Sequence, residues 1–225
     1  MAALLIAPLL AVALVAGVWV AGGVVTNDYR ASMALTALWL AASGVGCAAV
    51  ALRRRDLRFP VLGTYVLVTG ALGGYLAVTT LRDRVVDEQV VVAAPPAAMR
   101  SERATRERAA RAARAVNVEV ARGRFRAGEH ATMGRASVVR LPGGRRFVTL
   151  TAFATSPGPD LRVRLVRGDT FDGAADGALD LGALKGNRGD QQYELARGVA
   201  VAGRSVVIWC RAFSAPFGAA YLRTS

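Results

Sequence analysis

Long apolar runs alternate with short polar loops over the first third of the chain. Residues 2–25, 31–52 and 61–81 contain no Asp, Glu, Lys, Arg or His. About 20 helical residues cross a hydrocarbon core of roughly 30 Å, so each run predicts a transmembrane helix with the lipid bilayer as its partner. The first run could instead be a cleaved signal peptide, but no Lys or Arg precedes it, which favours an uncleaved helix.

The loop between the second and third runs determines the expected orientation. It reads Arg53-Arg54-Arg55-Asp56-Leu57-Arg58, the only dense positive cluster between the runs. Positive loops stay in the cytoplasm, so we expect a multi-pass cell-membrane protein with a cytoplasmic N-terminus. Everything after Leu81 is then extracytoplasmic, even if the first run is removed. The lack of ionisable residues within the runs argues against a pump or transporter.

A linker is predicted to follow this three-span anchor of residues 1–81. It covers residues 82–115, where Pro95-Pro96 interrupts regular structure. Ser101 as N-cap and the arginines after it predict a basic helix over 101–115. This helix is either a solvated spacer, which the pattern favours, or a helix resting on anionic lipid headgroups.

Apolar and polar residues begin to alternate at Val116, and short runs of this kind are separated by Gly, Pro and Asn. Such a pattern is typical of strands and turns. The expected strands cover residues 116–120, 136–141, 146–153, 161–166, 179–184, 192–195, 205–211 and 219–223. Seven or eight short strands predict an antiparallel β-sandwich or barrel-like domain over 116–225. The fold class is therefore membrane α plus all-β.

The net charge of +13 does not indicate a nucleic-acid-binding protein. A single lysine, Lys185, and 28 arginines make up the 29 basic residues, which reflects a compositional bias as much as a selected basic surface. No basic patch is interleaved with stacking aromatics. The soluble part is also expected on the wrong side of the membrane, so we expect no nucleic-acid partner.

Two cysteines occur, Cys47 in the second apolar run and Cys210 at the end of Val206-Val207-Ile208-Trp209-Cys210. A bilayer would separate them, so a disulfide between them is not expected. A lone thiol outside the reducing cytosol tends to be oxidised, paired with another chain or bound to a group. Cys210 is either such a reactive thiol, facing a loop-lined pocket, or a small buried hydrophobe that ends a strand.

Four pieces of the soluble part resemble the DM-thirteen domain family, also called the electron-transfer DM domain. The resemblance runs from about Gly123 to Leu222. Its pieces are Gly123-Arg124-Phe125 with His130 and Gly134; Phe153-Ala154-Thr155-Ser156-Pro157-Gly158-Pro159-Asp160-Leu161; Leu181-Gly182-Ala183-Leu184-Lys185-Gly186-Asn187 through Gly189-Asp190-Gln191-Gln192-Tyr193; and Val206-Val207-Ile208-Trp209-Cys210 with Phe213, Phe217 and Ala220.

The resemblance implies an extracytoplasmic β-sandwich-like module that takes part in electron transfer. It makes Cys210 the expected redox-active or cofactor-holding thiol, and a membrane or surface redox protein the expected partner. Lys185 matches a family motif and His130 could supply a second ligand, so both are candidate cofactor-binding residues. The cofactor is left unknown. A haem or another redox group at Cys210 remains open, whereas blue-copper and structural zinc sites need more Cys and His ligands than this chain has.

Two functions follow from these observations. The first is a membrane-anchored electron-transfer domain centred on Cys210. The alternative is a non-catalytic binding or scaffold module whose cysteine is only packed. No Ser/His/Asp constellation or paired-carboxylate motif is present, which favours either module over a stand-alone enzyme.

Overall fold

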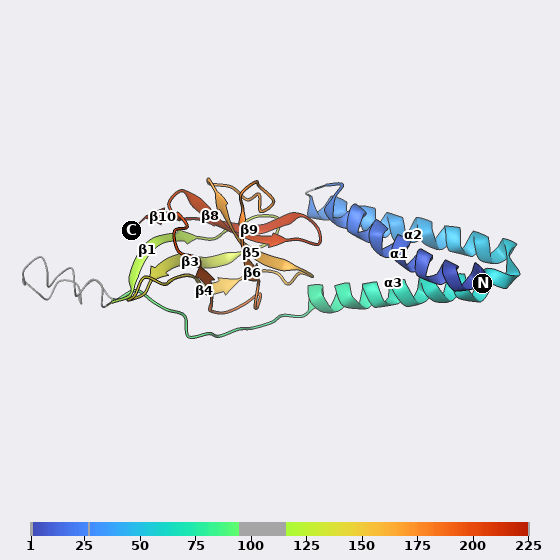
Figure 1. The fold of residues 1–225 in the computed structure, drawn as a ribbon, viewed down its shortest axis with the longest axis horizontal. Coiled ribbons are helices and arrows are strands. Elements are labelled where there is room, and N and C mark those ends of the chain that lie inside the picture. Colours follow the sequence, from blue (N-terminus) through green and yellow to red (C-terminus); the bar gives the residue numbers. More distant parts are fainter. Residues whose placement is uncertain (1, 27, 95–115, 225) are drawn as a thin grey trace, which may run out of the picture. The chain divides into compact units, whose positions relative to one another are not determined.

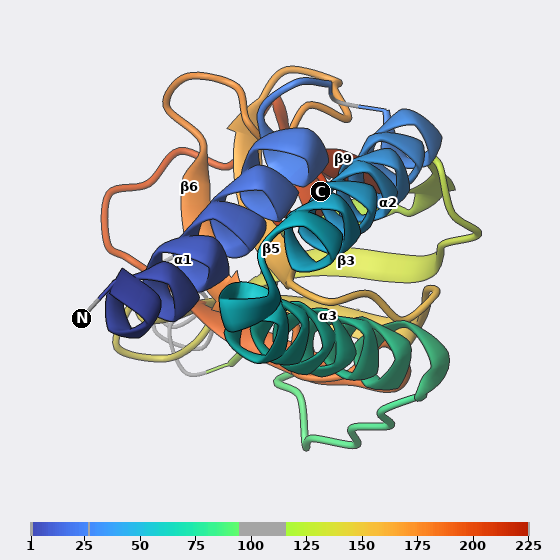
Figure 2. The ribbon, with the colours of Figure 1, turned by 90° about the vertical axis from the view of Figure 1, so that its right-hand side faces the viewer.

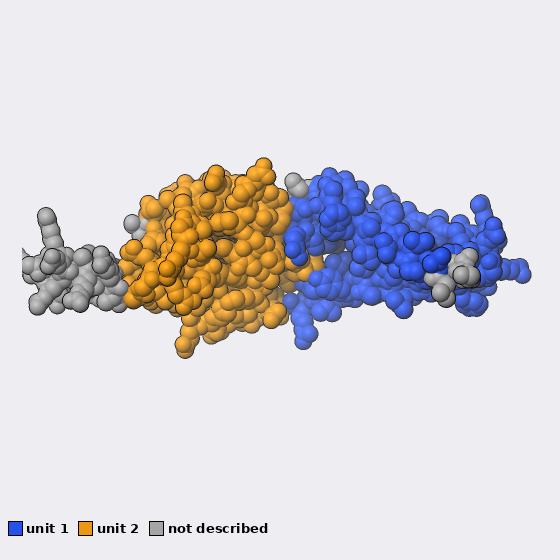
Figure 3. All heavy atoms as spheres, viewed as in Figure 1, with its two compact units in different colours: residues 1–82, 210–215 blue, residues 83–209, 216–225 orange. Residues whose placement is uncertain are grey.

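The computed structural model describes residues 2–26, 28–94 and 116–224. The basic helix expected over 101–115 lies outside these residues. The chain divides into two compact units (Figure 3). Unit 1 is Met1–Arg82 with Cys210–Ala215, and unit 2 is Asp83–Trp209 with Pro216–Ser225.

Unit 1 contains three long helices, which confirms the expectation of three apolar membrane-length segments. They are α1 (Ala2–Gly23), α2 (Tyr29–Arg53) and α3 (Arg58–Leu81), with the short 3-10 helix η1 (Arg55–Leu57) between the last two. Each is long and apolar enough to cross a membrane. Helix α2 begins two residues before the expected position because the Asp28 side chain caps it, accepting a hydrogen bond from the Ala31 amide at 2.7 Å.

The three helices lie side by side and contact one another (Figure 2). Two aromatic side chains hydrogen-bond across them: the Trp39 indole Nε1 donates to the Leu14 carbonyl at 3.3 Å, and the Tyr65 hydroxyl donates to the Leu40 carbonyl at 2.8 Å. Both rings lie where a glycine has no side chain, since a Cβ on Gly17 would meet Trp39 and one on Gly44 would meet Tyr65. Small residues thus allow close packing between the helices.

Unit 2 is formed around two five-stranded sheets, as expected for a β-sandwich (Figure 1). The first sheet has the order β10 (Arg223–Thr224), β1 (Val118–Arg124), β3 (Met133–Arg140), β4 (Arg146–Ala154) and β7 (Gln191–Leu195). The second has the order β2 (Arg126–Ala127), β9 (Ala215–Tyr221), β8 (Arg204–Cys210), β5 (Leu161–Arg167) and β6 (Leu179–Ala183).

The described residues thus form ten strands, where seven or eight were expected. The two short strands β2 and β10 account for the difference. Each contains two residues, which is too few for an alternating pattern to reveal. Each is a strand only because it pairs with a longer strand at the edge of its sheet: β2 pairs with β9, and β10 pairs with β1.

The core lies between the two sheets. Alternate residues of β4 and β5, such as Val148, Leu150, Val163 and Leu165, have no exposed surface, as period-2 strands require. Strand β8 is buried along Ser205–Cys210 without alternation. Its outer face is covered, because Trp209 and Val207 belong to an apolar cluster against which Phe171, Ala175 and Ala178 pack.

Candidate functional site

Cys210 is the last residue of β8 and carries a free thiol. None of its surface is exposed, and neither is any of the three strand residues Val206, Val207 and Ile208. The thiol is therefore shielded from solvent. A buried cysteine in such surroundings reacts slowly, which is the behaviour of a packed residue more than that of an open redox site.

His130 lies in the loop between β2 and β3. Its ring stacks on Phe217 of β9, with ring centroids 3.9 Å apart and an interplanar angle of 22°. Burial lowers the pKa of His130, so the imidazole is neutral at pH 7. Strand β9 is the neighbour of β8 in the second sheet. His130 thus contacts a residue of β9, the strand next to the one that ends at Cys210.

A chain of buried hydrogen bonds leads from Phe217 to loop residues beside the start of β3 and the end of β4. The Thr132 hydroxyl donates to the Phe217 carbonyl at 2.8 Å and lies 2.7 Å from the Thr155 hydroxyl. Because a hydroxyl has one proton, Thr155 must donate to Thr132. Asn187 extends the chain: its Nδ2 donates to the Thr155 carbonyl at 3.0 Å, and the Thr155 amide donates to the Asn187 carbonyl at 2.8 Å.

Lys185 is held in an ion pair with a residue from outside the sheets. Its Nζ donates to the two carboxylate oxygens of Glu88 at 2.7 and 2.9 Å and to the Gln192 carbonyl at 2.8 Å. These three bonds use all three ammonium protons. Burial by itself would raise the pKa of Glu88, but the bonds from Lys185 and the Gln192 amide more than compensate, and the pKa is lowered. Within this arrangement Lys185 has no proton left for a bound group.

Glu88 belongs to an extended segment, residues 83–92, that we call the strap (drawn in green in Figure 1). The strap runs along the loop before β7. The Val86 amide donates to the Arg188 carbonyl at 2.9 Å, and the Glu88 amide donates to the Asp190 carbonyl at 2.9 Å. The Asn187 side chain binds the start of the strap, accepting from the Arg84 amide at 2.6 Å.

Two glycines let the strap approach this closely. A Cβ on Gly186 would meet the Arg84 carbonyl oxygen, and a Cβ on Gly189 would meet the Val86 carbonyl oxygen. Gly189 also has φ of +96°, a conformation that glycine adopts without strain. The glycines of this motif therefore serve a backbone contact with the strap.

The strap also covers the edge of the first sheet. Strand β7 is the last strand in that sheet. The Gln192 amide donates to Glu88 Oε2 at 3.0 Å, and the Val91 amide donates to Gln192 Oε1 at 2.9 Å. The first of these bonds satisfies a main-chain amide that an uncovered edge strand would offer to other chains.

Several residues of this site were not identified from the sequence, chiefly Thr132, Thr155 and Glu88. Thr132 carries no signal beyond its type, and Thr155 lay within a matched motif that assigned it no role. Glu88 lies in a segment with no periodic pattern, so its pairing with Lys185, 97 positions away, could not be foreseen. Gln191 lay within the recognised motif, and the structure shows its part: it is fully buried, and its Oε1 accepts from the Tyr193 hydroxyl at 2.8 Å.

The residues around Cys210 do not fit a metal or haem site. In the described part of the chain, no three His, Cys, Asp or Glu side chains are grouped closely enough to hold a metal ion. A haem ligated by the Cys210 sulfur needs open space beside it, and the residue has no exposed surface. We therefore derive no chemical step through a haem.

The fold and site define a class: a protein with three apolar helices long enough to cross a membrane and one antiparallel β-sandwich domain. Residues 124–222 match the family model described as electron transfer DM13, so the chain carries a DM13 domain in its C-terminal half. The match includes Cys210, His130 and Lys185 but neither the helices nor the strap. No curated protein and no solved structure matches the chain.

Proposed function

We propose that this protein is a membrane-anchored electron-transfer module whose DM13 domain works outside the cytoplasm, with Cys210 as its redox thiol. The observation that carries this proposal is the match of residues 124–222 to an electron-transfer family, because Cys210 is the single cysteine within that range. Apolar helices of membrane length support the anchor. The arginines around η1 support an extracytoplasmic domain, since such loops stay inside.

The expected chemistry is a reversible change at one sulfur atom. Outside the cytosol a lone thiol can exchange with a disulfide of a membrane or surface redox protein. The Cys210 thiolate attacks one sulfur of that disulfide, the partner's S–S bond breaks, and the partner's other sulfur leaves as a thiolate that takes up the proton. Cys210 is thereby oxidised to a mixed disulfide and the partner's disulfide is reduced. Because Cys210 is buried at the end of β8, this exchange requires the end of the strand to open. The reaction is then slow in the free protein and faster when a partner stabilises the open form.

The test uses the full chain in detergent with Cys47→Ala, so that Cys210 is the only thiol. The protein is equilibrated in glutathione buffers of stepped potential, quenched with acid, unfolded and labelled with a maleimide. We expect the labelled fraction to follow the potential reversibly, with labelling of the native protein much slower than labelling of the unfolded protein. Cys47→Ala with Cys210→Ser is the control that gives the background.

A non-catalytic binding or scaffold module is the second candidate, and the complete burial of Cys210 favours it. It predicts that Cys210 stays reduced and unlabelled in the native protein at every potential, and that Cys210→Ala changes stability alone. A visible absorption spectrum of the purified protein also distinguishes the electron-transfer function from the scaffold function, because a bound redox cofactor would absorb visible light. A silent spectrum together with an inert Cys210 would assign the scaffold function.

A further inference from the structure

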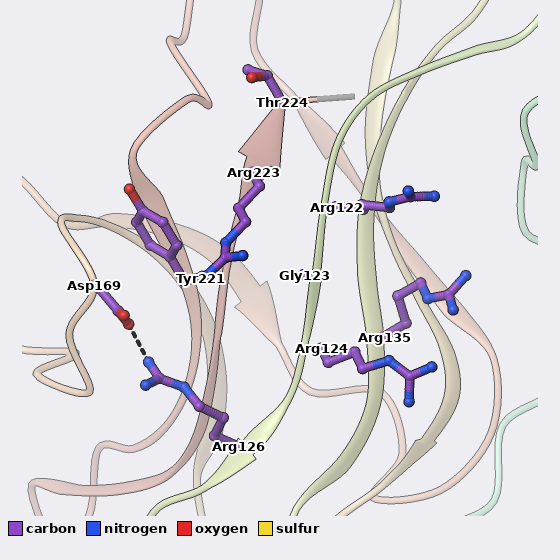
Figure 4. A pocket seen from close by; sticks show the side chains of 9 residues that line it. All are labelled: Arg122, Gly123, Arg124, Arg126, Arg135, Asp169, Tyr221, Arg223 and Thr224. Carbon is purple, nitrogen blue, oxygen red and sulfur yellow. Dashed lines mark hydrogen bonds and ion pairs between the residues drawn. The ribbon is translucent and has the colours of Figure 1, made fainter.

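Five arginines gather around β1, on residues that neither candidate function uses. They are Arg122, Arg124, Arg126, Arg135 and Arg223, and they line a groove of about 750 Å³ together with Asp169 (Figure 4). All five side chains are exposed. The groove lies within unit 2 and is lined by neither Cys210 nor His130.

The strand register brings these arginines into direct opposition. Arg122 of β1 pairs with Arg223 of β10, and Arg124 pairs with Arg135 of β3. Like charges directly opposite each other on neighbouring strands destabilise a sheet. This opposition costs stability at both pairs, and anionic groups bound on either side of β1 would offset that cost.

The protein's own carboxylates neutralise only part of this charge. Asp169 forms an ion pair with Arg126, and Glu119 lies 3.5 Å from Arg122. Among the residues that the structure describes, Arg124, Arg135 and Arg223 have no carboxylate oxygen within 4.0 Å. The groove thus keeps an excess of three positive charges.

The arrangement of the side chains indicates the shape of the ligand. Figure 4 shows Arg122, Arg124 and Arg135 extending to one side of β1, and Arg126 and Arg223 lying on the other. The groove, at about 750 Å³, holds more space than one small anion fills. A chain of anionic groups laid across β1 can contact both groups.

We propose that this groove binds a linear phosphate polymer. Guanidinium groups bind phosphate oxygens in pairs, and arginine keeps its charge at all relevant pH values. A single-stranded nucleic acid shares the phosphate chain, but its binding sites add aromatic platforms for the bases. Tyr221 is the only aromatic residue that lines the groove, which favours a polymer without bases.

The test measures binding of fluorescently labelled inorganic polyphosphate to the full chain in a nonionic detergent, by anisotropy at several salt concentrations. We expect saturable binding whose log K falls linearly with log salt. The variant Arg124→Gln with Arg135→Gln and Arg223→Gln should lower the affinity at least about tenfold and reduce the salt slope by about 2 to 3. Orthophosphate should compete weakly.

The matched control changes three other exposed arginines, Arg140→Gln, Arg167→Gln and Arg197→Gln, and so removes the same net charge. It should bind like the parent protein. An equal loss in this control would show that only overall charge matters and would overturn the proposal, as would the absence of saturable binding or equally strong binding of orthophosphate.

Two further competitors distinguish other sources of phosphate. Phosphatidylglycerol vesicles should not displace the labelled polymer, and displacement would assign the groove to lipid headgroups instead. Single-stranded DNA that bound more tightly than polyphosphate of equal charge would assign it to nucleic acid. Either result would contradict the proposal that the groove binds a polymer without bases. Neither result would affect the proposed redox role of Cys210.

Discussion

The surroundings of His130 change the pKa of its side chain. It is the chain's single histidine, and its ring is stacked on Phe217 instead of facing solvent. Burial disfavours the charged imidazolium and therefore lowers the pKa. The folded protein thus holds this group neutral at a pH where the unfolded chain already binds a proton.

This difference predicts a loss of stability in mild acid. A group whose pKa is lower in the folded state contributes stability that is complete above the unfolded value, about 6.5 for histidine, and is lost as the pH falls below it. We expect the melting temperature of the parent protein to fall between pH 7.5 and 5.5. His130→Phe keeps a ring on Phe217 but removes the titration, so its melting temperature should fall less.

Circular dichroism of the full chain in detergent measures both proteins. The comparison isolates His130 because the ion-paired carboxylates, such as Glu88 with its lowered pKa, titrate below this pH window. Equal falls in the two proteins would contradict the assignment of the acid sensitivity to His130.

Among the elements, the strap and β7 form a contact between segments about 100 positions apart in the chain. The receiving residues 185–192 lie inside the DM13 match, whereas the strap at 83–92 lies outside it. Main-chain bonds, the Asn187 side chain and the ion pair of Lys185 with Glu88 hold the two together. In this protein Gly186 and Gly189 of the family motif leave room for the backbone of the strap.

Gly189→Ala should release the strap. The added Cβ would collide with the Val86 carbonyl oxygen, and the backbone at φ of +96° is strained for alanine. We expect amide hydrogen exchange at Val86 and Glu88 to become at least about tenfold faster, as a loss of about 1.4 kcal/mol would produce. Peptide-level mass spectrometry of the full chain measures this exchange.

Gly144→Ala is the matched control for this experiment. Gly144 also has a positive φ, +86°, but a Cβ there meets nothing within 4 Å. The substitution brings similar backbone strain without a collision, so exchange in the strap should stay at the parental rate. If both variants released the strap equally, backbone strain and not the contact would be the cause.

For the whole molecule, the distribution of charge around the helices predicts sidedness. The arginines at the end of α2, in η1 and at the start of α3 lie together between two membrane-length helices. A charged loop of this kind is retained in the cytoplasm. Because α3 then leads outward, the DM13 domain should lie outside.

Reporters fused after Ser225 test this orientation. Alkaline phosphatase, which needs an oxidising compartment for its disulfides, should be active there, and a cytoplasmic fluorescent reporter should be dark. A variant with Arg53→Gln, Arg54→Gln and Arg55→Gln together with Thr26→Arg and Asn27→Arg moves the positive charge to the other side of the second helix. This variant should raise the fraction of molecules whose C-terminal domain faces the cytoplasm. An active cytoplasmic reporter on the parent protein would contradict an extracytoplasmic Cys210.

Much of the architecture could be predicted because its signals are local. Runs of about 20 uncharged residues identified the three helices, and alternation such as Leu161, Val163 and Leu165 identified β5. The motifs that identified the DM13 domain were also short stretches of neighbouring residues. Element ends were less well predicted, because they depend on caps such as Asp28.

The site could be predicted only in part. Cys210, His130 and Lys185 were singled out by residue type and motif, but nothing in the sequence stated what surrounds each of them. Lys185 is engaged by Glu88 and Gln192, and His130 is stacked on Phe217. The partner in each case is set by the fold, because strand pairing joins segments that are far apart in the chain.

By itself, the sequence determined the number of apolar helices, the all-β character of the C-terminal half and the family of that half, since all three depend on the order of neighbouring residues. The tertiary structure alone decided that the Cys210 thiol is buried, that the strap covers β7 and that arginines of β1 lie opposite arginines of β3 and β10. These properties arise from contacts between distant segments, and such contacts form only when hydrophobic burial and strand register bring the segments together.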